Sequence, residues 1–146
     1  MLIPTRALLA TESFGPGLPA QLVAEAIGRG LEKGGAPEPD LCPIVLEGEA
    51  PEELRALLEA VGFDRRMRAA RAVVLTTERL AERALAGSPA FEIATRARQA
   101  GVPAYAIAGQ SDLNPFDARI LDLQVIIPAA DARALTAAGK KLATLL

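Results

Sequence analysis

The sequence predicts an α/β protein in which a mostly parallel sheet of about five strands lies between two layers of helices. Short apolar runs alternate with longer amphipathic segments along the chain, and most links between them are short. Strands that alternate with helices form parallel sheets, because each helix carries the chain back across a face of the sheet. No repeat, linker or low-complexity tract divides the 146 residues, so we expect residues 1–146 to form a single domain.

Five apolar runs predict the strands. They are rich in Ala, Val, Leu and Ile, which favours strands that are buried on both faces. Pro39 and Pro43 accompany the second run and predict that it lies at an edge of the sheet, because proline lacks the N–H that an inner strand needs. The predicted strands are residues 7–11, 41–46, 72–76, 104–108 and 123–127.

The segments between these runs carry the signals of helices. Pro19, Pro51 and Pro89 each stand where the first turn of a helix begins. Proline is tolerated there because a backbone N–H at this position would have no acceptor within the helix. Ser88 and Asp131 precede predicted first turns and are good N-caps. The predicted helices are residues 19–33, 51–61, 78–86, 89–100 and 132–145, with a helical turn in 63–71 and an irregular connection at 110–119. Together these elements predict a Rossmann-like domain.

Composition excludes several classes of function. The net charge of −2 gives no positive field for nucleic acid, and no apolar run reaches the roughly 18 residues that a membrane span needs. We expect no signal peptide, no nucleic-acid or membrane partner, and a cytoplasmic location. The chain has no histidine and one cysteine, Cys42, which excludes internal disulfides, thiolate zinc clusters and Ser-His or Cys-His nucleophiles. We predict no metal site.

Polar residues follow the first predicted strand, at the end of the sheet where α/β proteins place their sites. Glu12 is a candidate for contact with a ligand or a metal, and Ser13 either binds a ligand or bonds a neighbouring backbone amide. Gly15-Pro16-Gly17 offers backbone N–H groups to a phosphate or carboxylate, or forms a tight turn that needs glycine. Gly15 and Gly17 are therefore candidate ligand-binding residues.

Further candidates follow the third and fourth predicted strands. Glu78 and Arg79 either contact an anionic ligand, through the forked guanidinium, or neutralise their charges with neighbours. Ser111 either borders a pocket or is an ordinary polar turn residue. A basic run is most simply a solvated face, with an acidic partner or polyanion as the alternative; it comprises Arg65, Arg66, Arg68 and Arg71.

Several segments, in the same order, resemble the glycerate kinases. Residues 12–15 (Glu-Ser-Phe-Gly) resemble the family's Asp-Ser-Phe-Lys, and residues 23–27 match its Val-Ala-Glu-Ala-Ile. Residues 72–80 look like the family's strand followed by Thr-Gly-Glu-Gly-Arg-Leu, and residues 85–88 parallel its Leu-Ala-Gly-Lys. Residues 97–109 are similar to its Ala-Lys-Lys-Ala-Gly-Val-Pro segment and the strand that follows. Residues 43–49 faintly echo Pro-Met-Ala-Asp-Gly-Gly-Glu.

The resemblance fails at charged positions. The family's lysines correspond to Gly15 and Ser88, its Asp to Ala81 and its Gln to Arg83. Phosphoryl transfer depends on cancelling negative charge around the phosphate, and losing one such donor costs about two to three orders of magnitude. The equivalents that the resemblance leaves are Ser13, Phe14, Glu49, Glu78, Arg79 and Gly87.

The resemblance implies that this chain corresponds to the family's Rossmann-like half, with the second domain missing between about Phe63 and Arg71. We therefore expect a vestigial kinase-like protein that binds a small anionic or nucleotide ligand at the carboxyl ends of its strands, with Ser88 among the binding candidates. One alternative is an interaction protein that forms a homo-oligomer over the surface left by the missing domain. Another is an active glycerate kinase that completes its site across a subunit interface, with ATP and Mg²⁺ as cofactors.

Overall fold

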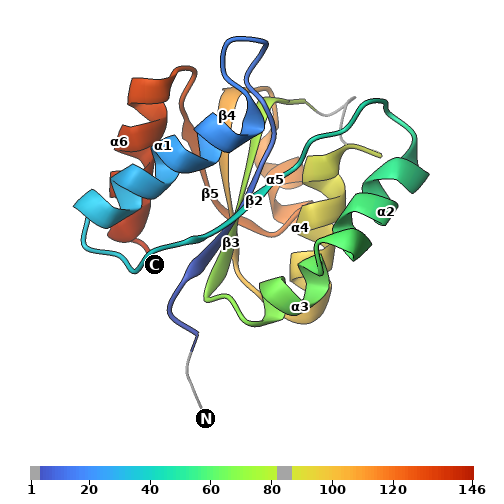
Figure 1. Cartoon of the computed structure of the whole chain (residues 1–146), viewed down its shortest axis with the longest axis horizontal. Coiled ribbons are helices and arrows are strands. Elements are labelled where there is room, and N and C mark those ends of the chain that lie inside the picture. The colour runs from blue at the N-terminus through green and yellow to red at the C-terminus, as the bar shows by residue number, and fades with distance from the viewer. Residues whose placement is uncertain (1–3, 82–86) are drawn as a thin grey trace.

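The computed structural model describes residues 4–81 and 87–146. Within these residues, five parallel strands form one sheet in the order β2-β1-β3-β4-β5 (Figure 1). The predicted parallel α/β fold is confirmed, and β2 lies at an edge as expected from its prolines. The strands are β1 (Ala7–Thr11), β2 (Asp40–Pro43), β3 (Ala72–Leu80), β4 (Ala104–Ser111) and β5 (Leu123–Pro128).

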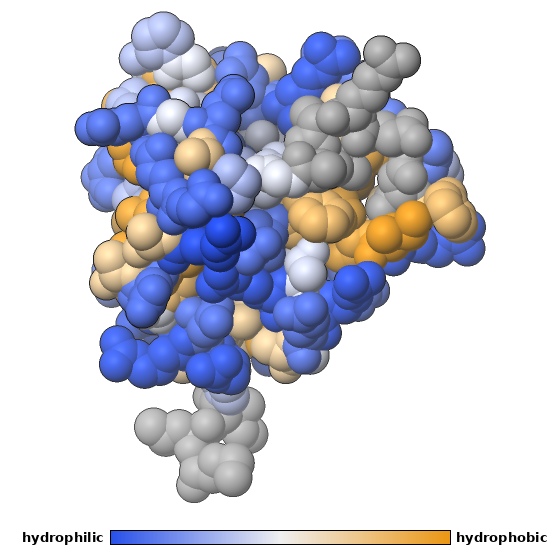
Figure 2. All heavy atoms as spheres, turned by 90° about the vertical axis from the view of Figure 1, so that its right-hand side faces the viewer, coloured by the Kyte–Doolittle hydropathy of each residue, from blue (hydrophilic) through white to orange (hydrophobic). Residues whose placement is uncertain are grey.

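Helices cover both faces of the sheet and make the fold three-layered and Rossmann-like. α1 (Ala20–Lys33) and α6 (Ala132–Ala143) cover one face (Figure 1). The other face is covered by α2 (Pro51–Ala60), α3 (Phe63–Arg68) and α4 (Pro89–Ala100), whose outer surface is mostly hydrophilic (Figure 2). The remaining described helix, α5 (Pro115–Ile120), precedes β5. None of the described helices is both long and apolar enough to cross a membrane.

Side chains of the central strands alternate between two apolar cores. Leu9 and Val74 face α1 and α6, where they join Ile27 in one core. Leu8 and Val73 face the opposite way, into the core beneath α2, α3 and α4. This alternation is the period of two that a strand imposes, and it explains why both faces of β1 had to be apolar.

The local signals at helix starts act as the sequence predicts. Ser88 Oγ accepts a hydrogen bond from the Phe91 N–H at 3.2 Å, and Asp131 Oδ1 accepts one from the Ala134 N–H at 2.8 Å. Each bond satisfies a donor that the first turn of a helix leaves unpaired. These two caps fix where α4 and α6 begin.

Several boundaries differ from the sequence-based prediction. β3 and β4 run on to Leu80 and Ser111 because they continue to pair with each other past the end of β1. The helix expected at 78–86 is therefore wrong for residues 78–80, and residues 82–86 lie outside the described part of the chain. β2 ends at Pro43 rather than at residue 46, and the connection expected at 110–119 contains the end of β4 and most of α5.

Candidate functional site

A cleft of about 870 Å³ opens at the carboxyl end of the sheet, beside β1 and β3. From β1 the chain moves to β2 on one side, and from β2 it crosses to β3 on the other, so the winding direction reverses between β1 and β3. Ligands of open α/β sheets bind at such reversal points, because the loops on the two sides separate there. The walls come from the β1–α1 turn, the β2–α2 loop, the end of β3 and the start of α4.

Glu12 stands at the base of this cleft, directly after β1. Its backbone N–H donates to the Thr76 Oγ1 at 3.2 Å and lies 3.3 Å from the Thr76 carbonyl oxygen, which holds the residue against β3. Burial raises the pKa of Glu12 to about 7, and a hydrogen bond with the Thr77 side chain acts in the opposite direction. A carboxyl group with such a pKa can accept or donate a proton near neutral pH.

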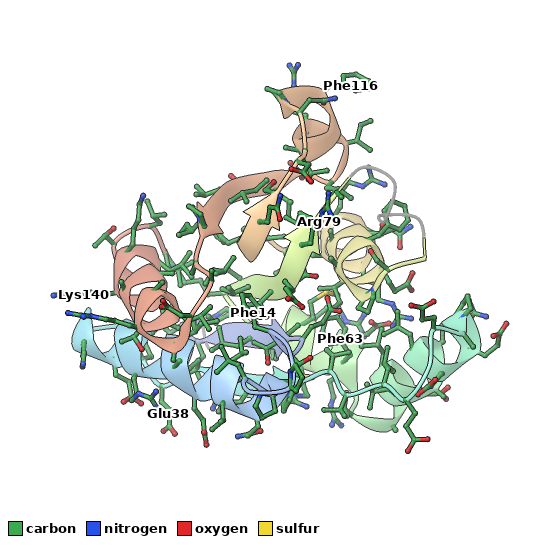
Figure 3. The ribbon with its side chains drawn as sticks, turned by 90° about the horizontal axis from the view of Figure 1, so that it is seen from above. Phe14, Glu38, Phe63, Arg79, Phe116 and Lys140 are labelled. Atoms are coloured by element: carbon green, nitrogen blue, oxygen red, sulfur yellow. The ribbon has the colours of Figure 1, made fainter. Side chains whose placement is uncertain are left out.

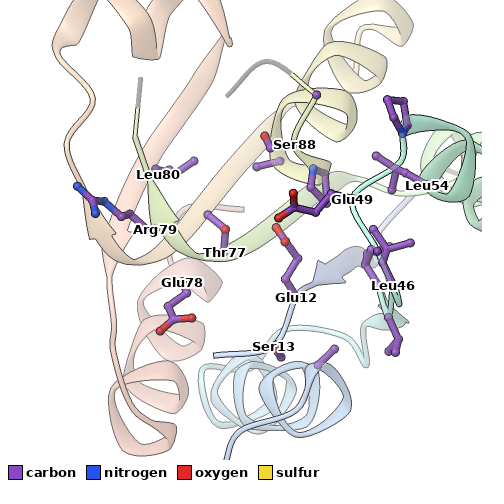
Figure 4. Close-up of a pocket in the computed structure, with 18 of the residues that line it drawn as sticks. Glu12, Ser13, Leu46, Glu49, Leu54, Thr77, Glu78, Arg79, Leu80 and Ser88 are labelled. Carbon is purple, nitrogen blue, oxygen red and sulfur yellow. The ribbon is translucent and has the colours of Figure 1, made fainter. Parts of the chain in front are cut away.

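The loop between β2 and α2 brings Glu49 to the opposite wall. The Glu53 carboxylate, in the first turn of α2, accepts hydrogen bonds from the N–H groups of Glu47 at 2.6 Å and Gly48 at 3.0 Å. The Ile44 N–H donates to the Thr11 carbonyl at 2.7 Å and ties the start of the loop to β1. In Figure 4 the carboxylates of Glu12 and Glu49 point toward one another.

The extension of β3 and β4 past β1 forms a further wall. The Asp112 N–H donates to the Leu80 carbonyl at 2.7 Å, and the Arg79 guanidinium contacts Asp112 Oδ2 at 2.8 and 3.1 Å. Figure 4 shows Arg79 and Glu78 directed away from Glu12. Arg79 therefore lines the cleft with its positive charge already engaged by a carboxylate.

Five of the residues predicted as candidates line this one cleft. They are Glu12, Ser13, Glu78, Arg79 and Ser88. Figure 4 shows that they differ in direction, since Glu12 points inward and Glu78 points away.

Three other candidates lie outside the lining. Gly15 and Gly17 belong to the turn between β1 and α1, where Gly15 has a φ of 87° and its carbonyl accepts from the Leu18 N–H at 3.2 Å. Ser111 is the exposed last residue of β4. Arg83, which the resemblance aligns with a family glutamine, falls outside the described residues.

Other residues that line the cleft were not predicted as candidates from the sequence pattern alone. Thr77 follows the predicted end of a strand and carries no motif, although its side chain bonds Glu12. Glu49 was named only through the resemblance. The apolar wall carries no signal that would separate it from ordinary core; its members include Ile44, Leu46, Leu54 and Leu80.

The described residues offer little to a metal ion by themselves. Among them, no three His, Cys, Asp or Glu side chains come close enough together to hold one. Cys42 is buried in the core beneath α2, α3 and α4. The cleft thus offers two facing carboxylates, several hydroxyls and aliphatic walls.

Comparison with known proteins identifies a family. The model of the glycerate kinase family matches residues 42–145. Among curated proteins none matches the chain significantly.

Two solved structures share the fold. A putative pilus assembly-related protein from Burkholderia pseudomallei has a TM-score of 0.50 and 15% identity, over 96% of this chain and 90% of its own. A diflavin flavoprotein A3 from Nostoc sp. has a TM-score of 0.50 and 15% identity, over 99% of this chain and 94% of its own. At this identity they indicate the fold alone.

Proposed function

Because the chain belongs to the glycerate kinase family, we propose that it is a single-domain, vestigial member that binds a small anionic or nucleotide ligand and transfers phosphoryl groups inefficiently. The observation that carries this proposal is the cleft beside β1 and β3, which gathers five of the candidate residues where α/β sheets hold their ligands. A volume of about 870 Å³ is within the range of small-molecule sites.

Donors for an anion are present, but they are few. Ser13 and Ser88 contribute hydroxyl groups, and Arg79 contributes the only cationic side chain among the described lining residues. The ion pair of Arg79 with Asp112 is exposed, and exposed pairs are worth about 0–1 kcal/mol, so an anion can compete for the guanidinium. This set supports modest binding of an anion.

Inefficient phosphoryl transfer follows from the charges that the cleft lacks. Lysines occur only at positions 33, 140 and 141, in α1 and α6 on the other face of the sheet. The described lining presents the carboxylates of Glu12, Glu49 and Glu78, which oppose the charge of a triphosphate. This donor set does not fit Mg²⁺-ATP as a kinase must hold it.

Binding is tested by thermal unfolding with glycerate, phosphate and nucleotides. A ligand at 100 times its Kd raises the free energy of unfolding by about 2.7 kcal/mol, which is readily measured. We expect saturable stabilisation that Ser13→Trp abolishes, because the indole would fill the cleft, and that Ser111→Trp retains, since that serine is exposed outside it. A flat response to every ligand at millimolar concentration contradicts the proposal, as does efficient phosphorylation of glycerate.

Self-association is a second candidate, favoured by α5. Phe116 and Ile120 are 64% and 47% exposed, and their spacing of four residues places them on one side of the helix. Figure 3 shows α5 standing away from the sheet with Phe116 at its outer end. We expect light scattering to detect a homo-oligomer that Ile120→Lys dissociates and Leu22→Lys, at a side chain 46% exposed on α1, does not. A strictly monomeric particle at high concentration rejects this candidate.

A further inference from the structure

The inner part of the cleft is rich in hydrogen-bond acceptors. Glu12 comes from the end of β1 and Glu49 from the β2–α2 loop, and the two carboxylates point toward one another (Figure 4). The only cationic side chain of the described lining, Arg79, is directed away and holds Asp112. A ligand group between the two glutamates therefore meets acceptors and negative charge.

Several backbone donors at the starts of α2 and α4 and in the β2–α2 loop are already engaged. Both α2 and α4 begin with proline, which removes one N–H from each first turn. Ser88 takes the Phe91 N–H, the Ala50 carbonyl accepts the Glu53 N–H at 3.1 Å, and Glu53 takes two N–H groups of the β2–α2 loop. Acidic residues in both first turns also offset the positive ends of these helices; they are Glu52, Glu53 and Glu92. At these two helix starts, several of the groups that hold phosphates in other proteins are thus already used, whereas α1 begins beside the cleft with no side-chain cap.

Aliphatic side chains line the cleft on two sides. Figure 4 shows Leu46 and Leu54 on the side of Glu49, and Leu80 on the other side, next to Arg79. Leu80 and Leu54 are 1% and 5% exposed, so their positions are fixed by the core. Such side chains accommodate a flat or apolar group next to the hydrogen-bonding end of a ligand.

We propose that this cleft recognises an uncharged, hydroxyl-bearing ligand of the nucleoside class, to which phosphate groups add no affinity. The inference rests on the proposed function and narrows it to the non-phosphate end of a nucleotide. The sugar hydroxyls donate to the carboxylates of Glu12 and Glu49, and the base lies against the leucines. A carboxylate is the acceptor that ribose hydroxyls meet in dinucleotide-binding folds, so the chemistry is well matched.

Charge explains why phosphates add nothing. The titratable groups around Glu12 are Glu49 from the β2–α2 loop and Glu78 and Arg79 from β3, with Arg79 paired to Asp112. Each phosphate of a nucleotide adds negative charge beside Glu49 and, at a pH above 7, beside the ionised carboxylate of Glu12 as well. A nucleoside brings the same hydroxyls without this repulsion.

The experiment measures Kd by calorimetry at pH 8, above the pKa of Glu12, for the four common ribonucleosides, their 2′,3′-dideoxy analogues and their triphosphates, using the full chain. We expect at least one ribonucleoside to bind as tightly as its triphosphate or severalfold more tightly. The dideoxy analogue should bind about tenfold more weakly or worse, because it loses two hydrogen bonds to charged acceptors.

Variants locate the effect. Glu12→Gln should weaken nucleoside binding about tenfold and reduce the difference between nucleoside and triphosphate, since the repelling charge is gone. Glu59→Gln removes an exposed carboxylate of α2 outside the lining and should leave every Kd unchanged. Retained secondary structure and cooperative unfolding of Glu12→Gln show that the loss is not a folding defect.

The outcomes separate this inference from the proposed function. Triphosphates that bind tenfold or more tightly than nucleosides overturn the inference and leave the proposed function standing. Dideoxy analogues that bind as tightly as ribonucleosides also overturn it. If neither nucleosides nor any anion binds, both proposals fail.

Discussion

Replacing Glu12 by glutamine tests the electrostatics of the cleft directly. The carboxyl group is partly buried between β1 and β3, and burial raises its pKa from 4.5 to about 7. Glutamine keeps the shape and an oxygen that can accept the hydrogen bond from Thr77, but it cannot ionise. The variant therefore isolates the free energy of holding a charge at this position.

The magnitude follows from linkage. A shift of 4.5 to about 7 corresponds to about 3 kcal/mol, at 1.36 kcal/mol per pKa unit. Because the pKa is raised in the folded state, the stability from the bound proton is fully present below pH 4.5 and is lost as the pH rises through 7. The native protein should thus be as stable as Glu12→Gln near pH 4 and about 3 kcal/mol less stable at pH 8.

The assay is urea unfolding of both proteins from pH 4 to pH 9. In urea, the difference in unfolding free energy between the two proteins should grow across pH 4.5–7 and then level off. In thermal unfolding at pH 8, the melting temperature of the variant should be roughly 6–12 °C higher. Glu59→Gln, which removes an exposed charge from α2, should follow the native curve. Parallel curves for the native protein and Glu12→Gln would show that burial does not penalise the Glu12 charge.

Three further substitutions test the scaffold. Arg66→Met should lower the unfolding free energy, measured in urea, by about 1–3 kcal/mol, because it removes the 2.6 and 3.0 Å hydrogen bonds to Asp40. The control Arg65→Met, on the exposed side of α3, should change it by less than about 0.5 kcal/mol. Phe63→Ala should cost about 3–5 kcal/mol by calorimetry, because the ring is fully buried; a smaller loss means that the site collapses. Gly30→Ala should be strongly destabilising, since its Cβ would overlap the Thr136 carbonyl of α6, and an unchanged Tm would show that α1 and α6 can separate freely.

The sequence is sufficient for the fold class because an apolar run bounded by turn signals marks the position of each strand, although not its ends. The sequence-based prediction fails where pairing between strands overrides the helix propensity of the individual residues. Glu78, Arg79 and Leu80 are good helix formers, yet they continue β3 because Arg79 and Leu80 pair with Gln110 and Ser111 of β4. The partners belong to β4, so the residues at 78–80 by themselves give no indication of where β3 ends.

The candidate site was predictable only in part, because the positions of the strands can be recognised in the sequence but their order in the sheet cannot. Glu12 and Ser13 follow a recognisable strand, and the carboxyl end of a parallel sheet is a general place for sites. The order of the strands decides which of these ends face the cleft. Ser111 ends β4, one strand further from the reversal point, and it does not line the cleft. Strand order depends on packing between segments that are distant in the sequence, so the local residue pattern does not predict it.

The helix α3 stands where the resemblance places the family's second domain. Phe63 and Met67 are 0% and 1% exposed, and they close the core between α2 and β3. Arg66 ties this helix to Asp40 of β2 with two bonds, while Asp64 contacts Arg96 of α4 at 3.0 Å.

A six-residue helix anchored to a strand and to a second helix buries apolar surface that would otherwise be exposed at this junction. The junction is thus closed by α3 in this chain, and this supports the proposal of a single self-sufficient domain. The walls of the cleft then come only from the carboxyl end of this sheet and the segments beside it, and Arg79 is the one cation in its described lining. Any further cation needed for phosphoryl transfer would have to come from a residue outside that lining.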